Sequence, residues 1–276
     1  MLLIDFNQIV IANIMVQHKS VKITDELIRY CALNSLRYYI KKFKNEYPET
    51  VICTDARNSW RYEFFPYYKG NRCITQDASK YDWKMIHDTI GTIRTELMEH
   101  FPHKVLQVDR AEADDIIAVL TLHSTEPTLI ISSDKDFLQL QWKGNVRQYS
   151  PKHEDFIACE DPTGFLRDHI IRGDASDGIP NILSEDTSFV FKTRQKVLTQ
   201  TRLENAQWAL INDDLGDLKA NYIRNKTLID LESIPKDLED SILEHYRTAP
   251  KRNKQKLLNY FIKYRLSGMS SEITDF

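Results

Sequence analysis

Short apolar runs alternate with longer amphipathic segments along the first part of the chain. The runs are rich in Leu, Ile and Val, as buried strands are, and in the longer segments apolar residues recur at helical spacing. This alternation predicts crossover connections and a mainly parallel central sheet with helices on both faces, which is an α/β fold. The predicted strands are 2–6, 50–55, 104–109 and 127–134, and the predicted helices are 24–47, 83–101 and 113–124.

The pattern becomes almost wholly helical after about residue 160. Helical spacing predicts helices over 163–174, 192–208 and 254–266. We therefore expect an α/β core over residues 1–159 and a smaller helical C-terminal region over residues 160–276, packed on the core.

The composition is typical of an ordered globular protein. The 276 residues are 42% hydrophobic and 28% charged, and no apolar segment approaches the ~18 residues of a membrane span. The apolar N-terminus has no basic stretch and is interrupted by Asp5, Asn7 and Asn13, so we expect no signal peptide, no membrane association and a cytoplasmic location. The four cysteines form no CxxC pair, which predicts free thiols with neither disulfide nor zinc. The net charge of −3 argues at first against a nucleic-acid partner.

Aspartates end three of the predicted strands. Asp5, Asp55 and Asp134 each follow a buried apolar run, and the carboxyl ends of parallel strands share one edge of the sheet, where ligands of such folds bind. We therefore expect these three carboxylates to converge. More acids stand beside them in the sequence or in the segment GDASDGIPNI: Glu112, Asp114, Asp115, Asp136, Asp174 and Asp177.

Each acid alone has an ordinary explanation, as a helix N-cap or as a partner of a helix dipole. Together they do not, because two like charges ~5 Å apart repel by roughly 3 kcal/mol at an effective dielectric constant of about 20. Either several carboxyl groups are protonated or cations lie among them. We see no histidine or cysteine in the cluster, so its ligands are hard oxygens, which suit Mg²⁺ or Mn²⁺. A site that holds two such ions ~4 Å apart, both bound to one phosphodiester group, needs this many carboxylate ligands.

A stretch of interleaved aromatic and basic residues follows the second predicted strand, in WRYEFFPYYKGNRCITQDASKYDW. An ordinary amphipathic surface helix also explains this composition. Taken alone, the stretch favours that explanation, although aromatic rings beside cations are also found on surfaces that bind unpaired nucleic acid.

The ordered set of Asp5, Asp55, AEADD, SSDKDF and GDASDGIPNI resembles the 5′-nuclease family of flap endonucleases and 5′→3′ exonucleases, and within it the ribonucleases H of T-even phages. The resemblance covers nearly the whole chain, including WRYEFFPYYKGNR and NYIRNKTLIDLESIP. Each motif alone is weak, but their order is specific. The segment after Pro180 lacks the Gly-x-Gly hairpin with which many members grip duplex DNA and a monovalent cation.

The resemblance implies a PIN-like, 5′-nuclease fold and a phosphodiesterase that uses two Mg²⁺ ions, with Mn²⁺ as a substitute. The first ion would be held by Asp5, Asp55, Glu112 and Asp114, with Asp134 near or between the two. The second would be held by Asp136, Asp174 and Asp177, and Asp115 would support the cluster. Residues 58–84 would form an arch above the site.

The resemblance also assigns the basic and aromatic positions. Arg61, Lys69 and Arg72 would contact the scissile and neighbouring phosphates, and unpaired bases would stack on Tyr67 and Tyr68. Local positive charge adds Lys192, Arg194, Lys196, Lys251 and Arg252 as further candidates for phosphate contacts, and a solvated helix start explains Lys251 and Arg252 equally well. With the nine acids set aside as a metal socket, the net charge of −3 becomes +6 for the rest of the chain, which suits salt-dependent backbone binding.

We interpret the sequence as a structure-specific 5′→3′ exonuclease and flap endonuclease that leaves 5′-phosphate and 3′-hydroxyl ends and removes RNA primers and 5′ flaps in phage DNA replication. Its partners would be DNA and RNA/DNA duplexes with 5′ ends or flaps, with single-strand binding protein and sliding clamp as further candidates, and the protein would be a monomer. A PIN-like ribonuclease and a catalytically inactive DNA-binding or scaffold protein remain alternatives.

Overall fold

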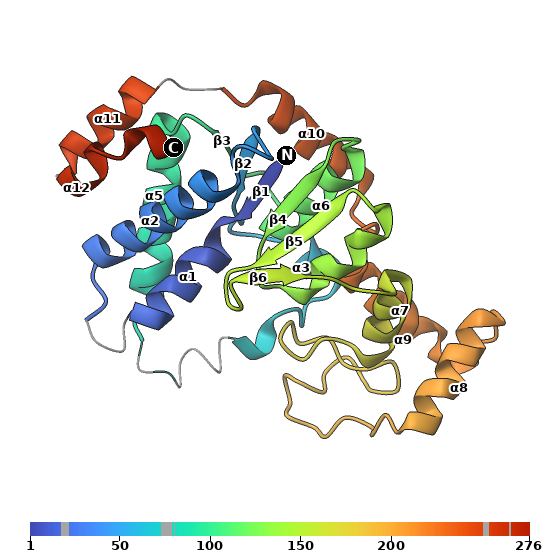
Figure 1. Cartoon of the computed structure of the whole chain (residues 1–276). Helices are drawn as coiled ribbons and strands as arrows, with labels where there is room; N and C mark the ends of the chain where they lie inside the picture. The colour runs from blue at the N-terminus through green and yellow to red at the C-terminus, as the bar shows by residue number, and fades with distance from the viewer. Residues whose placement is uncertain (18–21, 73–78, 80, 251–253, 265) are drawn as a thin grey trace.

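A six-stranded sheet forms the centre of the computed structural model, which describes residues 1–17, 22–72, 79, 81–250, 254–264 and 266–276. The strand order is β3-β2-β1-β4-β5-β6 (Figure 1). Neighbouring strands from β3 to β5 are parallel, and only β6 pairs antiparallel, on β5. The bounds are β1 Leu2–Asp5, β2 Thr50–Cys53, β3 Lys104–Leu106, β4 Thr128–Ile131, β5 Val146–Ser150 and β6 Asp155–Ile157. The predicted α/β fold with a mainly parallel sheet is confirmed.

Side chains alternate between the two faces of the sheet. Ile4 and Ile131 enter one apolar cluster, and Leu3 and Ile130 enter the other. Because both faces are covered, the strands are apolar throughout. The first cluster is covered by α1 (Phe6–Gln17), α2 (Asp25–Phe43), α5 (Trp83–His100) and α11 (Lys254–Lys263), and the second by α3 (Trp60–Phe64), α6 (Ala113–His123), η1 (Lys135–Lys143) and α10 (Lys236–Thr248).

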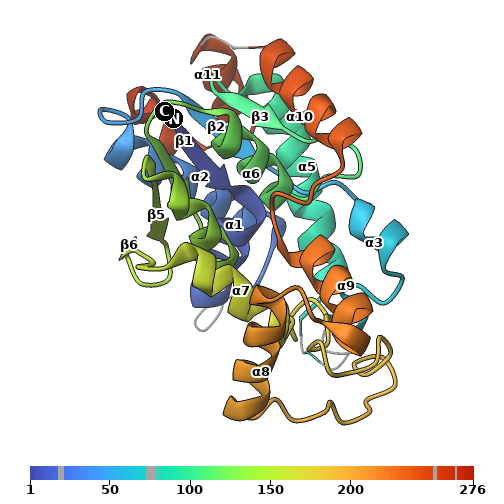
Figure 2. The same cartoon turned by 90° about the vertical axis from the view of Figure 1, so that its right-hand side faces the viewer.

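The helices after β6 pack in two different places. Figure 2 shows α7 (Pro162–Arg172), α8 (Gln200–Ile211) and α9 (Lys219–Ile229) gathered at one end of the molecule, with two small apolar clusters of their own. By contrast, α10 and α11 return to the two faces of the sheet. The described residues after β6 also include the short elements η2 (Gly216–Leu218), α12 (Ser267–Ser270) and η3 (Ile273–Asp275). The division into 1–159 and 160–276 stays a prediction.

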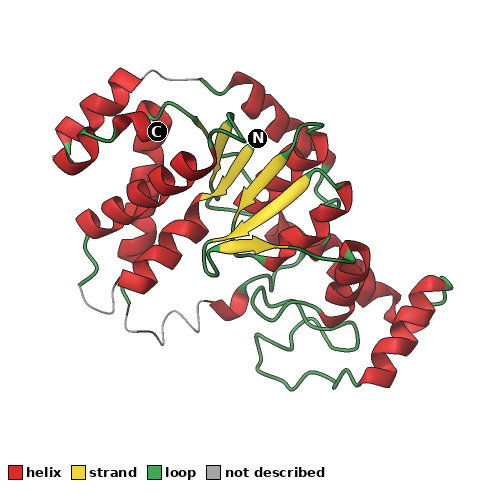
Figure 3. Cartoon of the chain, in the orientation of Figure 1, coloured by secondary structure: helices red, strands yellow, loops and turns green. Residues whose placement is uncertain are grey.

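One predicted helix begins later than expected. Residues 192–199 have no helical structure, and α8 begins only at Gln200, where the Thr199 side chain accepts a hydrogen bond from Arg202 N. The preceding loop is held by side chains, since Asn181 Nδ2 donates to Lys196 O at 2.9 Å and Lys196 N donates to Ser184 Oγ at 2.9 Å. Figure 3 shows this long loop beside α8. Helical spacing of apolar residues alone did not reveal the competing loop contacts.

Two expectations about composition can be compared with the described residues. Cys31, Cys53 and Cys159 are free thiols, as predicted, and Cys73 lies outside the described residues. None of the helices in the described part of the chain is both long and apolar enough to cross a lipid bilayer.

Candidate metal-binding site at the carboxyl edge of the sheet

The central strands deliver three carboxylates to one edge of the sheet. Asp5 is the last residue of β1, whose neighbours are β2 and β4, and Asp55 and Asp134 follow those two strands closely. Asp5 accepts hydrogen bonds from Gln8 N at 3.2 Å and from Ser132 Oγ at 3.0 Å. The structure therefore brings together the three acids that the strand ends predicted.

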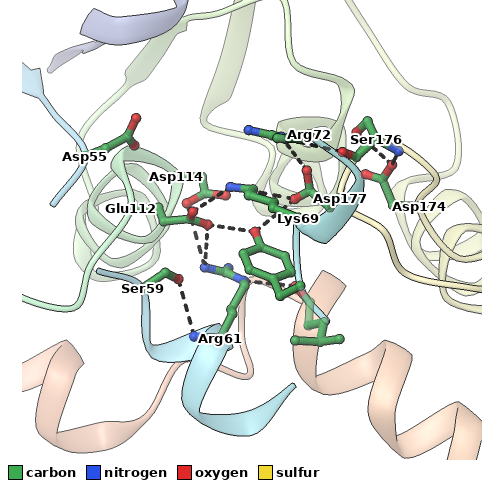
Figure 4. A network of polar contacts seen from close by, with 12 residues as sticks. Asp55, Ser59, Arg61, Lys69, Arg72, Glu112, Asp114, Asp174, Ser176 and Asp177 are labelled. Atoms are coloured by element: carbon green, nitrogen blue, oxygen red, sulfur yellow. Dashed lines mark hydrogen bonds and ion pairs between the residues drawn. The ribbon is translucent and has the colours of Figure 1, made fainter. Parts of the chain in front are cut away.

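Asp55 links this edge to helix α6. Its Oδ1 accepts from Ala113 N at 2.8 Å, at the start of α6, and its Oδ2 accepts from Asn7 Nδ2 at 2.6 Å. The first turn of α6 thereby fixes one carboxylate and presents the next ones, Glu112 and Asp114, beside it (Figure 4).

The pKa values report how crowded the acids are. Burial, reinforced by the charge of Asp55, raises the pKa of Asp5 to about 7. The pKa of Asp134 is raised by burial and by the charges of Asp177 and Asp174. For Asp136, burial and the charges of Asp134 and Asp174 raise the pKa well above its ordinary value. Carboxyl groups with raised pKa values gain from any cation that enters among them.

Two residues of the predicted site, Arg61 and Asp115, are buried beside the acidic cluster. Arg61 is 2% exposed; its Nη1 donates to Asp115 Oδ2 at 3.1 Å and its Nε to Leu228 O at 3.0 Å. Asp115 is 0% exposed and also accepts from Trp60 Nε1 at 3.2 Å and from Glu112 N at 2.9 Å.

These contacts correct the expectation for Arg61, which cannot contact a phosphate from this position because its guanidinium is enclosed by the protein. Asp115 was expected to support the cluster rather than to hold an ion, and its carboxylate is engaged by Arg61, Trp60 Nε1 and Glu112 N. The pair instead places a buried positive charge under Glu112, whose Oε2 lies 3.3 Å from Arg61 Nη1 (Figure 4).

The base of the predicted arch is bound to the loop that carries Asp177. Lys69 N donates to Asp177 O at 2.7 Å, and Arg72 pairs with the Asp177 carboxylate. Lys69 Nζ also pairs with Glu112. Burial alone would raise the pKa of Asp177, but the charges of Lys69 and Arg72 hold it below its ordinary value. Both cations therefore face the acidic cluster, as the phosphate-binding prediction requires.

The two tyrosines of the arch differ. Tyr68 is 1% exposed, and its hydroxyl oxygen lies 2.7 Å from Glu112 Oε2 and 2.9 Å from Asp177 Oδ2, so that its single proton is shared between the two carboxylates. The expected base stacking on Tyr68 is therefore wrong for this arrangement, because no face of its ring is open. Tyr67 is half-buried, and its stacking role stays a prediction.

Three further basic candidates lie on the loop before α8. Lys192, Arg194 and Lys196 are all exposed there, and their contact with a nucleic-acid backbone stays a prediction. Lys251, Arg252 and residues 73–78 and 80 of the arch lie outside the described residues.

A histidine belongs to the acidic cluster, contrary to expectation. His169 on α7 has Nδ1 3.5 Å from Asp136 Oδ1 and Nε2 3.9 Å from Asp174 Oδ2. One ligand atom from each of these three residues lies within 4.8 Å of the others. Burial lowers the pKa of His169, and the charges of Asp174 and Asp134 oppose this shift. The available signal was its place on the last turns of the helix that leads into Asp174.

The cleft fits divalent cations by its donor chemistry. A cavity of about 700 Å³ is lined by Asp134, Asp136, His169 and Asp174, with Phe165 on its apolar side. Carboxylate oxygens predominate, which suits Mg²⁺ and Mn²⁺. The neighbouring cations Lys69 and Arg72 would favour an anionic ligand above these acids.

Comparisons with known proteins agree with this chemistry. Residues 2–164 match the family model described as the 5′-3′ exonuclease N-terminal resolvase-like domain, and residues 166–276 match that of the T4 RNase H C-terminal domain. Ribonuclease H of Enterobacteria phage T4 is 31% identical over 290 residues, covering 99% of this chain and 95% of that protein. A 5′-3′ exonuclease of Buchnera aphidicola is 28% identical over 55% of this chain and 54% of its own.

Solved structures share the fold. The zinc-bound T5 5′-exonuclease aligns with a TM-score of 0.63 at 17% identity, over 91% of this chain and 99% of that chain. A T5 flap endonuclease in a pseudo-enzyme–product complex with DNA and metal ions aligns with a TM-score of 0.60 at 18% identity, over 90% and 99%.

Replacing Asp5 by asparagine should stabilise the metal-free protein in a pH-dependent way. The ordinary pKa of an aspartate is about 3.9 and that of folded Asp5 is about 7, so in this window the folded state binds more protons than the unfolded chain. The stability that this group contributes is therefore lost as the pH rises through the window, and asparagine cannot ionise. In EDTA, Asp5→Asn should melt above the wild type at pH 8, and the difference should shrink toward pH 5.

The exposed Asp240 provides the matched control. Asp240→Asn should melt like the wild type at both pH values. A Tm difference for Asp5→Asn that does not change with pH would show that Asp5 ionises normally in the folded protein.

Replacing Arg61 by methionine should strongly destabilise the fold. The change leaves Asp115 as a buried charge without its partner, which typically costs about 3–5 kcal/mol. The free energy of unfolding in urea measures the loss. In the double variant with Asp115→Asn, part of this loss should be recovered, because the charge left unpaired is then gone. A single Arg61→Met variant within about 1 kcal/mol of the wild type would contradict the supporting role of Arg61.

Proposed function

The chain belongs to the 5′-3′ exonuclease family, and from this premise we propose that it is a structure-specific, metal-dependent 5′-nuclease. It acts as a 5′→3′ exonuclease and flap endonuclease and hydrolyses phosphodiester bonds to leave 5′-phosphate ends. The observation that carries the proposal is the acidic cleft at the carboxyl edge of the sheet, with Lys69 and Arg72 beside it.

The donor set supports two Mg²⁺ ions, with Mn²⁺ able to substitute. Divalent ions in such a site supply a water nucleophile at neutral pH and stabilise charge on the leaving oxygen. We assign the first ion to Asp5, Asp55, Glu112 and Asp114, and the second to Asp136, Asp174 and Asp177, with Asp134 between them.

The protein's own groups bind and orient the substrate. Lys69 is 15% exposed in its side chain and Arg72 48% exposed, so each can exchange a carboxylate partner for a phosphate oxygen. Arg61 stays buried and keeps Glu112 directed at the cleft. Exposed Lys192, Arg194 and Lys196 then bind the duplex backbone without reading its sequence.

The biological setting follows from the family resemblance. We propose that the substrates are DNA and RNA/DNA duplexes with 5′ ends or flaps, and that the enzyme removes RNA primers and flaps during phage DNA replication. On this proposal it acts as a monomer in the host cytoplasm, with single-strand binding protein and sliding clamp as candidate partners.

Replacing Asp134 by asparagine should abolish cleavage while leaving DNA binding within about tenfold of the wild type, because the change removes charge from the metal socket but no phosphate contact. Labelled 5′-flap, nicked-duplex and single-stranded RNA substrates, each with Mg²⁺ or with EDTA, provide the measurement. EDTA should abolish wild-type cleavage in the same way.

Asp240→Asn, on the distant helix α10, should cleave at the wild-type rate. Wild-type turnover by Asp134→Asn would remove this residue from the metal site. Cleavage of single-stranded RNA alone would point to a PIN-like ribonuclease, and binding without cleavage by the wild type would point to a scaffold.

A further inference from the structure

Helix α7 ends in a turn that folds Asp174 back toward His169. Gly173 has φ +70°, and a Cβ there would lie 2.4 Å from Ile179 O, so the turn requires glycine. Beyond it, Asp174 Oδ1 accepts hydrogen bonds from Ser176 N and Ser176 Oγ, both at 2.7 Å (Figure 4). Its other oxygen, Oδ2, lies toward His169 Nε2.

Asp136 approaches the same ring from the first turn of η1. This turn is capped by Asp134, whose Oδ1 accepts a hydrogen bond from Asp136 N at 3.0 Å. Asp136 Oδ1 then lies 3.5 Å from His169 Nδ1, a ring nitrogen that is buried and forms no hydrogen bond within the described residues. A buried nitrogen without a partner is costly, unless a ligand completes its coordination.

The spacing suits a shared cation. Ligand atoms bound at about 2.0–2.2 Å to one octahedral ion lie about 3–4.3 Å apart. The three ligand atoms of Asp136, His169 and Asp174 lie within 4.8 Å of one another. Small side-chain movements would therefore bring all three within bonding distance of one ion. Asp177, by contrast, is engaged by Tyr68 and Arg72.

We propose that His169 is a nitrogen ligand of the cation that Asp136 and Asp174 hold. The inference rests on the proposed function and extends it, because a mixed nitrogen–oxygen shell prefers transition-metal cations to Mg²⁺ more strongly than a shell of oxygens does. This site therefore takes Mn²⁺ in preference to Mg²⁺, while the site at Asp5 and Asp55 stays a hard-oxygen site.

Pulsed electron paramagnetic resonance tests the ligand directly. The full chain is loaded with one and then two equivalents of Mn²⁺, with the bound number counted by calorimetry, and modulation from a coordinated ¹⁴N nucleus is recorded. We expect this signal in the wild type, and we expect it to change to that of ¹⁵N when only histidine is ¹⁵N-labelled. The labelling arm needs no variant and so does not depend on how a variant folds.

Variants then identify the residue. His169→Gln should lose the nitrogen signal and lower the Mn²⁺ affinity relative to Mg²⁺ by roughly tenfold, while its melting temperature in EDTA shows whether it folds. His153→Gln, at an exposed position elsewhere, should keep the signal and the affinity ratio.

Failure of the His169 proposal and failure of the proposed function give different results. Mn²⁺ bound at full stoichiometry without a histidine-dependent nitrogen signal would overturn the role of His169 and leave the proposed function standing. No bound Mn²⁺ at all would overturn both.

Discussion

Repulsion among carboxylates at one edge of the sheet is the constraint on which the rest of the site depends. The parallel order of β2, β1 and β4 places Asp5, Asp55 and Asp134 together, because Asp5 ends β1 and the other two follow closely after the neighbouring strands. Burial raises the pKa of Asp5 to about 7, and the charges of Asp55 and Asp134 add to this shift. An arrangement this unfavourable persists where binding of a cation offsets it.

The protein supplies part of the compensating charge itself. Arg61 lies beneath Glu112 and Asp115, and Lys69 and Arg72 lie on the opposite side of the cluster, against Glu112 and Asp177. The buried Arg61 is enclosed by the protein, whereas the more exposed Lys69 and Arg72 are the proposed phosphate-binding groups. Contacts of Lys69 and Arg72 with the Asp177 loop therefore link the base of the arch to the proposed metal site, so that substrate and cations act on the same few side chains.

The convergence of the strand-end aspartates could be predicted from the sequence, because the hydrophobic pattern locates the strand ends and parallel topology places those ends at one edge of the sheet. The burial of individual side chains could not be predicted from the sequence. Arg61 and Tyr68 carry polar groups typical of a surface. Only the contacts of Arg61 with α6 and α9, and of Tyr68 with Glu112 and Asp177, reveal that they are buried. His169 was missed because the turn at Gly173 decides which side chain of α7 meets Asp174. The loop before α8 was assigned to a helix because its side-chain hydrogen bonds join residues distant in sequence, such as Asn181 and Lys196.

An anomalous difference map from a crystal grown with Mn²⁺ tests the central claim most directly. The account predicts two peaks about 4 Å apart, one against Asp5 and Asp55 and the other against Asp136 and Asp174. Carboxylates gathered as described, with no anomalous peak within bonding distance of any of them, would contradict it.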